Sequence, residues 1–297
     1  MLRKIMMLLA LGALLAPIAH ADTAAAPMTV DDILAKHYEA CGGLAKMKAV
    51  NTMRVTGTIT LGPGMEAPFT MERKRPGMRR MEFSLQGMTG IQAFDGSKTW
   101  SVMPFMGKKD PEVGTDEDNK NAQDDADFDG ALVDYKTKGH TIELMGKEPV
   151  EGADAYKLKV TKKNGNIEYD YLDAETFLLV KTEGKVKRRG TEMEGETTFS
   201  DYKEVDGLMQ PFSMESGAKE MPQKQKLTFT KIELNVPLDD ARFAVPAGAT
   251  GGSAPAAAVA DSSKAAGDAT ATTAAADSTK KDSKGKSTKS SSSKKKS

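Results

Sequence analysis

Two histidines are the first candidates for catalysis, because imidazole is the commonest general base at neutral pH. They are His37 and His140, and both lie beyond the first 21 residues. A hydrolytic triad would need one of them beside a serine or cysteine nucleophile and an acid. Neither lies in a nucleophile elbow or an HExxH pattern, and the sequence has no phosphate-binding loop or dinucleotide-binding glycine motif. The sequence therefore predicts a protein that is not an enzyme and needs no cofactor.

An acidic run offers a second possible chemistry. Asp125-Ala126-Asp127-Phe128-Asp129-Gly130 matches the first half of a calcium-binding EF-hand loop, with oxygen ligands at positions one, three and five and glycine at position six. Position twelve should be a bidentate glutamate, but Lys136 occupies it. Because that ligand is missing, a solvated acidic turn is the better interpretation. We predict no metal site.

Methionine is the residue type that points to a function. Fifteen of the eighteen methionines lie beyond residue 21. Their flexible thioether side chains adapt to variable apolar shapes, although any single one can be an ordinary core side chain. As a group they favour a deformable lining for acyl chains over a precisely packed core. Eight of them follow one another along the first expected strands: Met53, Met65, Met71, Met78, Met81, Met88, Met103 and Met106.

The elements that would position this lining are mostly β-strands. Apolar residues alternate with polar ones between residues 53 and 61, which is the period of a half-buried strand. Similar runs, separated by turns such as Asn164-Gly165, continue to residue 235 and give roughly a dozen short strands. A helix capped by Thr29 and stopped by Gly42-Gly43 precedes them. The acidic stretch 110–129 interrupts the strand pattern and is expected to be a helix or mobile loop laid across the sheet.

The first 21 residues indicate export. Arg3 and Lys4 precede an uncharged apolar run, and Ala19-His20-Ala21 fits a small-x-small cleavage pattern. The run is too short to span a bilayer. We therefore expect a cleaved signal peptide, residues 1–21, and a periplasmic protein. Cys41 is the only cysteine, so no internal disulfide is available in that compartment.

Charge and composition divide the rest of the chain into a body and a tail. Residues 248–297 hold nine lysines and four aspartates, a net charge of +5, and no aromatic residue. Such a segment is expected to be disordered. Residues 22–247 hold 31 basic and 38 acidic residues, a net charge of −7, which argues against nucleic-acid binding. We expect one folded domain in 22–247, followed by the tail.

Several short motifs, taken in order, resemble those of a known family. The fingerprint is Lys74-Arg75-Pro76, Met81-Glu82-Phe83, Phe94-Asp95-Gly96, Thr99-Trp100 and Pro104-Phe105, with Val205-Asp206-Gly207-Leu208-Met209-Gln210-Pro211 and Leu238-Asp239-Asp240-Ala241-Arg242-Phe243 near the end of the body. In this order and spacing they resemble the carrier fold of periplasmic lipoprotein-sorting proteins and their outer-membrane receptors. The resemblance spans about residues 29–247.

The resemblance implies a mainly β (α+β) fold, an incomplete antiparallel β-barrel of about eleven strands covered by a helical lid. It implies that acyl chains of lipoproteins or other lipids bind in the apolar concave face. It also implies that Arg75 holds the lid closed through hydrogen bonds to lid backbone. The lid itself would be acidic here, with only Phe128, Leu132 and Val133 to face the ligand. The expected ligand contacts are Val55, Ile59, Phe69, Met71, Met81, Phe83, Ile91, Trp100, Val102, Leu158 and Val160.

Two functions follow from these patterns. The first is a monomeric periplasmic carrier or chaperone for acyl chains, with partner proteins in the inner or outer membrane. The alternative is an envelope sensor or adaptor domain that docks on a membrane-bound regulator through the acidic stretch 110–129 and the basic tail.

Overall fold

The computed structural model describes residues 28–62, 64–188, 191–219, 221 and 224–251. The expected signal peptide, residues 1–21, lies outside them, and so does most of the expected tail. The described chain ends in a short strand at Thr250–Gly251, so the folded body extends past the expected boundary at residue 247. Among the described residues, no helix is long and apolar enough to cross a membrane.

Two helices open the described chain, and the first is capped by Thr29 and ends before Gly42-Gly43 as the sequence predicts. In α1 (Val30–Ala40), the hydroxyl of Thr29 accepts from the backbone N–H of Asp32, and the Asp32 carboxylate accepts from the N–H of Thr29. This capping box satisfies two N–H groups that the first turn would leave unpaired. Gly42, with a φ of 103°, follows the end of the helix, and α2 (Leu44–Ala49) comes next.

The strands follow in two runs with a helix between them. The first run is β1 (Thr52–Gly62), β2 (Met65–Lys74), β3 (Met78–Leu85), β4 (Met88–Phe94), β5 (Thr99–Met103) and β6 (Lys108–Val113). A short 3-10 turn, η1 (Pro104–Met106), separates β5 from β6, and α3 (Asp116–Asp124) follows β6. The second run is β7 (Thr141–Val150), β8 (Ala153–Thr161), β9 (Ile167–Asp173), β10 (Leu179–Arg188), β11 (Thr191–Val205), β12 (Leu208–Ala218) and β13 (Gln225–Leu234). A second 3-10 turn, η2 (Asp240–Arg242), and β14 (Thr250–Gly251) complete the chain.

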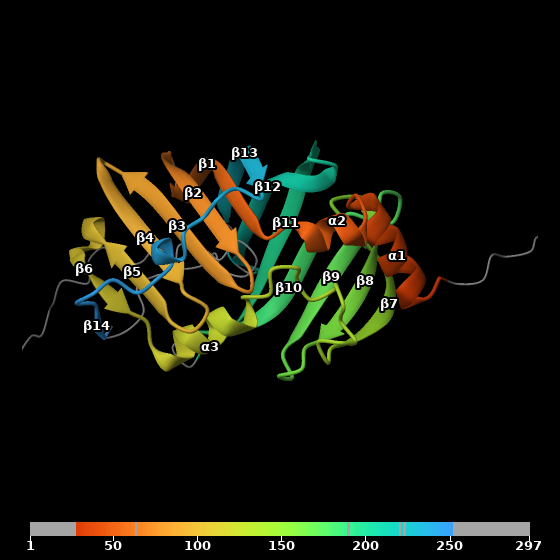
Figure 1. Ribbon diagram of the computed structural model, residues 1–297. Helices are drawn as coiled ribbons and strands as arrows, with labels where there is room; N and C mark the ends of the chain where they lie inside the picture. Colours follow the sequence, from red (N-terminus) through yellow and green to blue (C-terminus); the bar gives the residue numbers. More distant parts are fainter. Residues whose placement is uncertain (1–27, 63, 189–190, 220, 222–223, 252–297) are drawn as a thin grey trace, which may run out of the picture.

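All fourteen strands belong to one open sheet (Figure 1), in the order β14-β6-β5-β4-β3-β2-β1-β13-β12-β11-β10-β9-β8-β7. β1 to β6 form one antiparallel meander and β7 to β13 form another. The two join where β13 pairs with β1, with Val55 opposite Ile232. The structure is therefore mainly β with three α-helices in its described part. The described strands number fourteen, whereas the resemblance implies about eleven and the alternation pattern roughly a dozen. Alternation did not mark β6, which extends into the acidic stretch, or β14, which is only two residues long.

The sheet has an inner and an outer face, which the strand register defines. We call inner the face that carries Val55, Phe69 and Phe83, which lie on β1, β2 and β3. Paired residues of antiparallel strands point to the same face, so the register extends this assignment across the sheet. α1 and the segment that links β6 to β7, residues 114–140, pack on the inner face.

The C-terminal segment covers the outer face of the first meander. Phe243 is fully buried there, and its carbonyl accepts a 2.8 Å hydrogen bond from the indole Nε1 of Trp100. The guanidinium of Arg242 donates to the carboxylate of Glu72, which also accepts from Arg54. Glu72 is only 2% exposed, so its charge is held between these two cations. Both faces of the first meander are therefore partly buried.

Candidate functional site

The centre of the inner face is an apolar cluster to which, among the described residues, the helices contribute no side chain. Six of the eleven predicted ligand contacts lie in this cluster or pack against it: Val55, Ile59, Phe69, Met71, Met81 and Phe83. The remaining buried members come from β2, β5, β12 and β13: Ala67, Met103, Met214, Leu227, Phe229 and Ile232. The alternation in the sequence thus predicted the cluster residues of the first meander. The cluster residues of β12 and β13 could not be predicted in this way, because they join the cluster only through the pairing of β13 with β1.

The side chains of this cluster are packed against one another. The ring centroids of Phe69 and Phe229 are 5.9 Å apart. Ile59 and Leu227 are both 0% exposed, which means that no water-sized space lies beside them. An acyl chain can therefore reach this part of the inner face only if the cluster side chains move apart.

Two further predicted contacts, Leu158 and Val160, lie on the inner face but in a different cluster. They come from β8 and pack with Ile33 and Leu34 of α1, and all four are at most 2% exposed. The apolar side of α1 therefore already covers them, and they form the core beneath this helix rather than a continuation of the central cluster.

The other three predicted contacts lie on the outer face, which corrects the expectation that all eleven share one surface. Ile91 pairs with Val102, and Ala93 pairs with Trp100, in register with the outer-face residues of β3. The guanidinium of Arg80 lies 5.3 Å from the centroid of the Trp100 ring. The reason is that the C-terminal segment buries this face as well, so apolar residues occur on both sides of β4 and β5.

A polar strip separates the two apolar clusters of the inner face. The register places Glu168, Asp170, Thr197 and Ser216 there, and each is at most 8% exposed. The hydroxyls of Thr197 and Ser216 are hydrogen-bonded at 2.9 Å, and Lys162 pairs with Glu168 at 2.8 Å. The continuous apolar lining therefore ends at β11 and does not run the whole width of the sheet.

The acidic stretch 110–129 was expected to be a helix or loop laid across the sheet; residues 110–113 instead belong to β6, residues 116–124 form α3, and the segment 114–140 contacts the inner face. Ala122 and Ala126 pack on the fully buried ring of Phe94. Farther along, Leu132 joins the cluster beneath α1, and Val133 is 1% exposed. The contacts of the segment thus extend from β4 to α1. Ala122 and Ala126 make apolar contacts in addition to Leu132, which the sequence had suggested.

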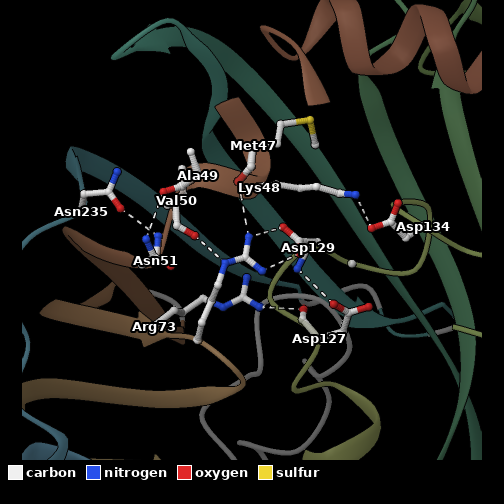
Figure 2. Close-up of polar contacts among 12 residues, drawn as sticks. Met47, Lys48, Ala49, Val50, Asn51, Arg73, Asp127, Asp129, Asp134 and Asn235 are labelled. Atoms are coloured by element: carbon white, nitrogen blue, oxygen red, sulfur yellow. Dashed lines mark hydrogen bonds and ion pairs between the residues drawn. The ribbon is translucent and has the colours of Figure 1, made fainter. Parts of the chain in front are cut away.

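Arg75, the predicted lid-latching residue, connects this crossing segment to α2. Its guanidinium donates two hydrogen bonds of 2.6 and 2.5 Å to the carboxylate of Asp129. Its Nε donates at 2.6 Å to the carbonyl of Val50, and one terminal nitrogen donates at 3.4 Å to the carbonyl of Met47. The planar fork of arginine suits such a combination, because it serves a carboxylate and helix-end carbonyls together. Figure 2 shows these contacts around Asp129, with Arg73 reaching the carbonyl of Asp127 beside them.

The Arg75–Asp129 pair is mostly shielded from water. The side chain of Arg75 is 25% exposed and that of Asp129 is 15% exposed. Burial by itself would raise the pKa of the Asp129 carboxyl, but the hydrogen bonds and charge of Arg75 outweigh it and lower the pKa below its ordinary value. Asp129 therefore stays ionised at neutral pH and holds the guanidinium in place.

Three more residues complete this junction: Phe128, which the sequence analysis expected to face the ligand, and Lys48 and Asp134, which sequence reasoning missed. The ring of Phe128 lies 4.5 Å from the Arg75 guanidinium and 5.1 Å from that of Arg73. Lys48 of α2 also pairs with Asp134 of the crossing segment. The basic and the acidic residues of this junction are both evident in the sequence. No local pattern shows that they contact one another.

The side chains that first suggested catalysis have structural contacts. Nδ1 of His37 donates to the carbonyl of Phe177 at 2.8 Å, and burial lowers the pKa of His37 despite this bond. Burial raises the pKa of the Cys41 thiol to about 11, so it is protonated at neutral pH. Nδ1 of His140 accepts from the backbone N–H of Lys163. Both histidines thus have hydrogen-bond partners within the fold.

Two of the three aspartates in the calcium-like run are in ion pairs. Asp129 binds Arg75, and Asp127 binds Lys138. In the part of the chain that the structure describes, no three histidine, cysteine or acidic side chains come together as a metal-binding group. Ion pairs with Arg75 and Lys138 therefore hold this run in place.

Comparison with known proteins agrees with this fold. A family model with the description "Uncharacterized protein" matches residues 94–247. No curated protein sequence matches the chain. A DUF1329 family protein from Desulfovibrio piger is 16% identical, with a TM-score of 0.50, and the match covers 72% of this chain and 97% of that one.

Two further solved structures are similar over the same part of the chain. A LolA superfamily protein from Nitrosomonas europaea is 15% identical, with a TM-score of 0.49 and coverage of 73% and 98%. An outer-membrane lipoprotein-sorting protein domain from Vibrio parahaemolyticus is 14% identical, with a TM-score of 0.49 and coverage of 72% and 97%. At such low identity the DUF1329 match establishes the fold alone. Solved structures similar to this chain thus include LolA-superfamily and DUF1329 proteins. Because the family model matches more than half of the 297 residues, the chain belongs to the family that this model describes.

Proposed function

We propose that this protein is a periplasmic carrier that holds an acyl chain of a lipoprotein or another lipid against the central apolar cluster of the inner face. The observation that carries the proposal is the extent of that cluster, to which six strands between β5 and β12 in the sheet order contribute buried apolar side chains. A fold that needed only a core would be expected to bury such a surface under a helix, as α1 does over Leu158 and Val160. The central cluster instead consists of strand side chains.

The sheet would act as an incomplete barrel, with the helices and the crossing segment 114–140 as its lid. In this proposal Arg75 is the latch, because its guanidinium joins the end of α2 to Asp129 of the crossing segment. The packed cluster then represents the closed, empty state. Loading would separate α2 from the crossing segment and let the inner side chains move apart around the ligand.

The energetics allow reversible loading. Burying one CH₂ group contributes about 0.8 kcal/mol, so a fourteen-carbon chain supplies on the order of 10 kcal/mol before any cost. Lost freedom of the ligand and opening of the packed cluster both reduce this value. Methionine side chains such as Met81 and Met214 lower the opening cost, because they change shape more readily than branched residues.

The test is displacement of a fluorescent fatty acid from the purified chain that starts at residue 22, together with native mass spectrometry for co-purified lipid. Met71→Ala on the inner face is the informative variant, and Val102→Ala on the outer face is its matched control, because both truncate a half-buried strand side chain. We expect Met71→Ala to change the probe affinity several-fold and Val102→Ala to leave it unchanged. A wild-type protein that takes up no probe and carries no lipid would show that the proposal is wrong.

Export remains part of this proposal. The amino-terminal sequence of the protein recovered from the periplasm should begin at Asp22, since the expected cleavage follows Ala21. Recovery of the full-length chain from the cytoplasm would contradict it.

A further inference from the structure

Two large apolar side chains are exposed at turns of the first meander, one between β1 and β2 and the other between β5 and β6. Met65 is 44% exposed and begins β2, and Met106 is 50% exposed and ends η1, between β5 and β6. Among the described residues Met81 and Met103 are buried, whereas Met145 and Met221 are exposed to a similar degree, so exposure alone does not distinguish Met65 and Met106. Their shared position at turns of the first meander does.

The topology puts these tips in one row. In an antiparallel meander every second turn lies at the same end of the sheet, so the β1–β2, β3–β4 and β5–β6 turns share one end. Successive turns are two strands apart, or about 10 Å, which makes a row of about 20 Å. We call this row the methionine rim; its members are Leu61, Met65, Leu85, Met88, Phe105 and Met106.

The tips of the rim are uncharged. No charged residue occurs in the connections 63–64, 86–87 and 104–107. Glu66 follows Met65, and Lys108 and Lys109 follow η1. Moving the tips out of water would therefore desolvate apolar side chains and short turns without burying a charge.

The rim is continuous with the central apolar cluster. Leu61 and Phe105 both pack against that cluster, and the ring of Phe105 lies 5.3 Å from the ring of Phe83. The two rings fit because position 90 is glycine: a Cβ there would lie 2.7 Å from Phe83 and 2.8 Å from Phe105. Leu61 and Phe105 thus connect the exposed tips to the central apolar cluster. The Arg75 junction lies at the opposite end of these strands, in the β2–β3 turn.

We propose that the methionine rim docks on a lipid bilayer, with its exposed methionines inserted between the headgroups. The proposal rests on the proposed carrier function, because it places the rim end of the inner face where an acyl chain leaves or enters the membrane. A lipid surface fits better than a folded protein partner. Three separate tips do not make the continuous surface of about 1,000 Å² that a specific protein interface needs, whereas inserted side chains in a bilayer add their contributions independently.

The experiment measures co-sedimentation of the chain from residue 22 with phosphatidylcholine vesicles, without and with phosphatidylglycerol. The test variants are Met65→Ser, Met106→Ser and the double variant. The matched control is Leu144→Ser with Met145→Ser, because these β7 residues are 36% and 53% exposed but lie near the opposite edge of the sheet. We expect about fivefold weaker partitioning for each rim substitution and about twenty-five-fold for both, since each removes one half-exposed apolar side chain from the contact. The control should bind like wild type.

A second readout locates the contact. Cys41 is mostly buried and its raised pKa keeps it protonated, so a fluorophore can be attached selectively to Met106→Cys or, as control, Met145→Cys. Vesicles should shift the emission of the label at position 106 to the blue and leave the label at position 145 unchanged. Equal partitioning of rim and control variants, or equal shifts at both positions, would overturn the proposal. Loss of a dimer in the rim variants, seen by light scattering without vesicles, would overturn it too, because the rim would then contact a second copy.

Fatty-acid displacement in the absence of vesicles separates this inference from the carrier function. If wild type binds the probe but not vesicles, the rim proposal fails alone. If wild type binds vesicles through the rim but takes up no probe, the carrier function fails, and the rim remains a membrane contact of a protein with another role.

Discussion

Removing the Arg75 guanidinium should be one of the most damaging single changes outside the apolar core. Arg75→Ala deletes two charge-assisted hydrogen bonds to Asp129 and the bond to the carbonyl of Val50. It also leaves the Asp129 carboxylate, 15% exposed, without its main partner. An exposed ion pair contributes at most about 1 kcal/mol, and breaking a buried one costs about 3–5 kcal/mol. With exposures of 25% and 15% this pair lies between those limits, so we expect a loss of about 3 kcal/mol.

The assay is urea and thermal unfolding of the chain from residue 22. In a domain of this size a loss of about 3 kcal/mol lowers Tm by roughly 6–12 °C. Asp129→Asn should cost about half as much, because the amide still accepts one hydrogen bond. The double variant should be about 1.5 kcal/mol more stable than the sum of the single effects predicts. Lys48→Ala is the control on the same junction: its pair with Asp134 is 43% and 41% exposed, so the change should cost less than about 0.5 kcal/mol.

The reasoning fails if Arg75→Ala unfolds within about 0.5 kcal/mol of wild type, or if the two single changes simply add. Either result would mean that water replaces the guanidinium contacts at little cost and that α2 is not joined to the crossing segment through Asp129. The latch role in loading would then lose its physical basis. Faster uptake of the fatty-acid probe by Arg75→Lys, which keeps the charge but loses the fork, would support it.

Three further predictions concern other parts of the fold. Gly90→Ala should lower the free energy of unfolding in urea by about 1–3 kcal/mol, because the added methyl group would clash with the rings of Phe83 and Phe105. An unchanged urea midpoint would show that the two rings can move aside. Burial lowers the pKa of His37 below its ordinary 6.5, so the folded protein binds this proton less readily than the unfolded chain. Wild type should therefore lose stability as the pH falls from about 6.5, and His37→Gln should lose less. Parallel pH profiles of the two proteins would contradict this. Cys41 should react slowly with a disulfide reagent at neutral pH in the folded protein and fully in urea, because burial raises its pKa to about 11; rapid labelling of folded protein would be inconsistent with it.

The local structure of this protein could be predicted from its sequence more completely than its pairing. The capping box at Thr29 and the alternation along β1 follow from neighbouring residues, and both are present. Trp100 is a residue whose burial the local sequence pattern does not predict. Alternation along β5 places Trp100 and Met103 on opposite faces, but only the C-terminal segment decides that the Trp100 face is also buried. That contact joins residues 143 positions apart, and no local pattern encodes it.

The role of the acidic crossing segment was likewise not predictable from its sequence alone. In residues 116–129 acidic side chains outnumber apolar ones, a composition that does not predict a cover for an apolar surface. In the structure Ala122 and Ala126 face the sheet, while Asp127 and Asp129 bind Lys138 and Arg75. The acidic residues therefore fix the segment at its edges, where charges reach partners and water, and small residues make the buried contact. A cover held by ion pairs can separate without exposing a large apolar surface of its own, and a lid that must open repeatedly needs that property.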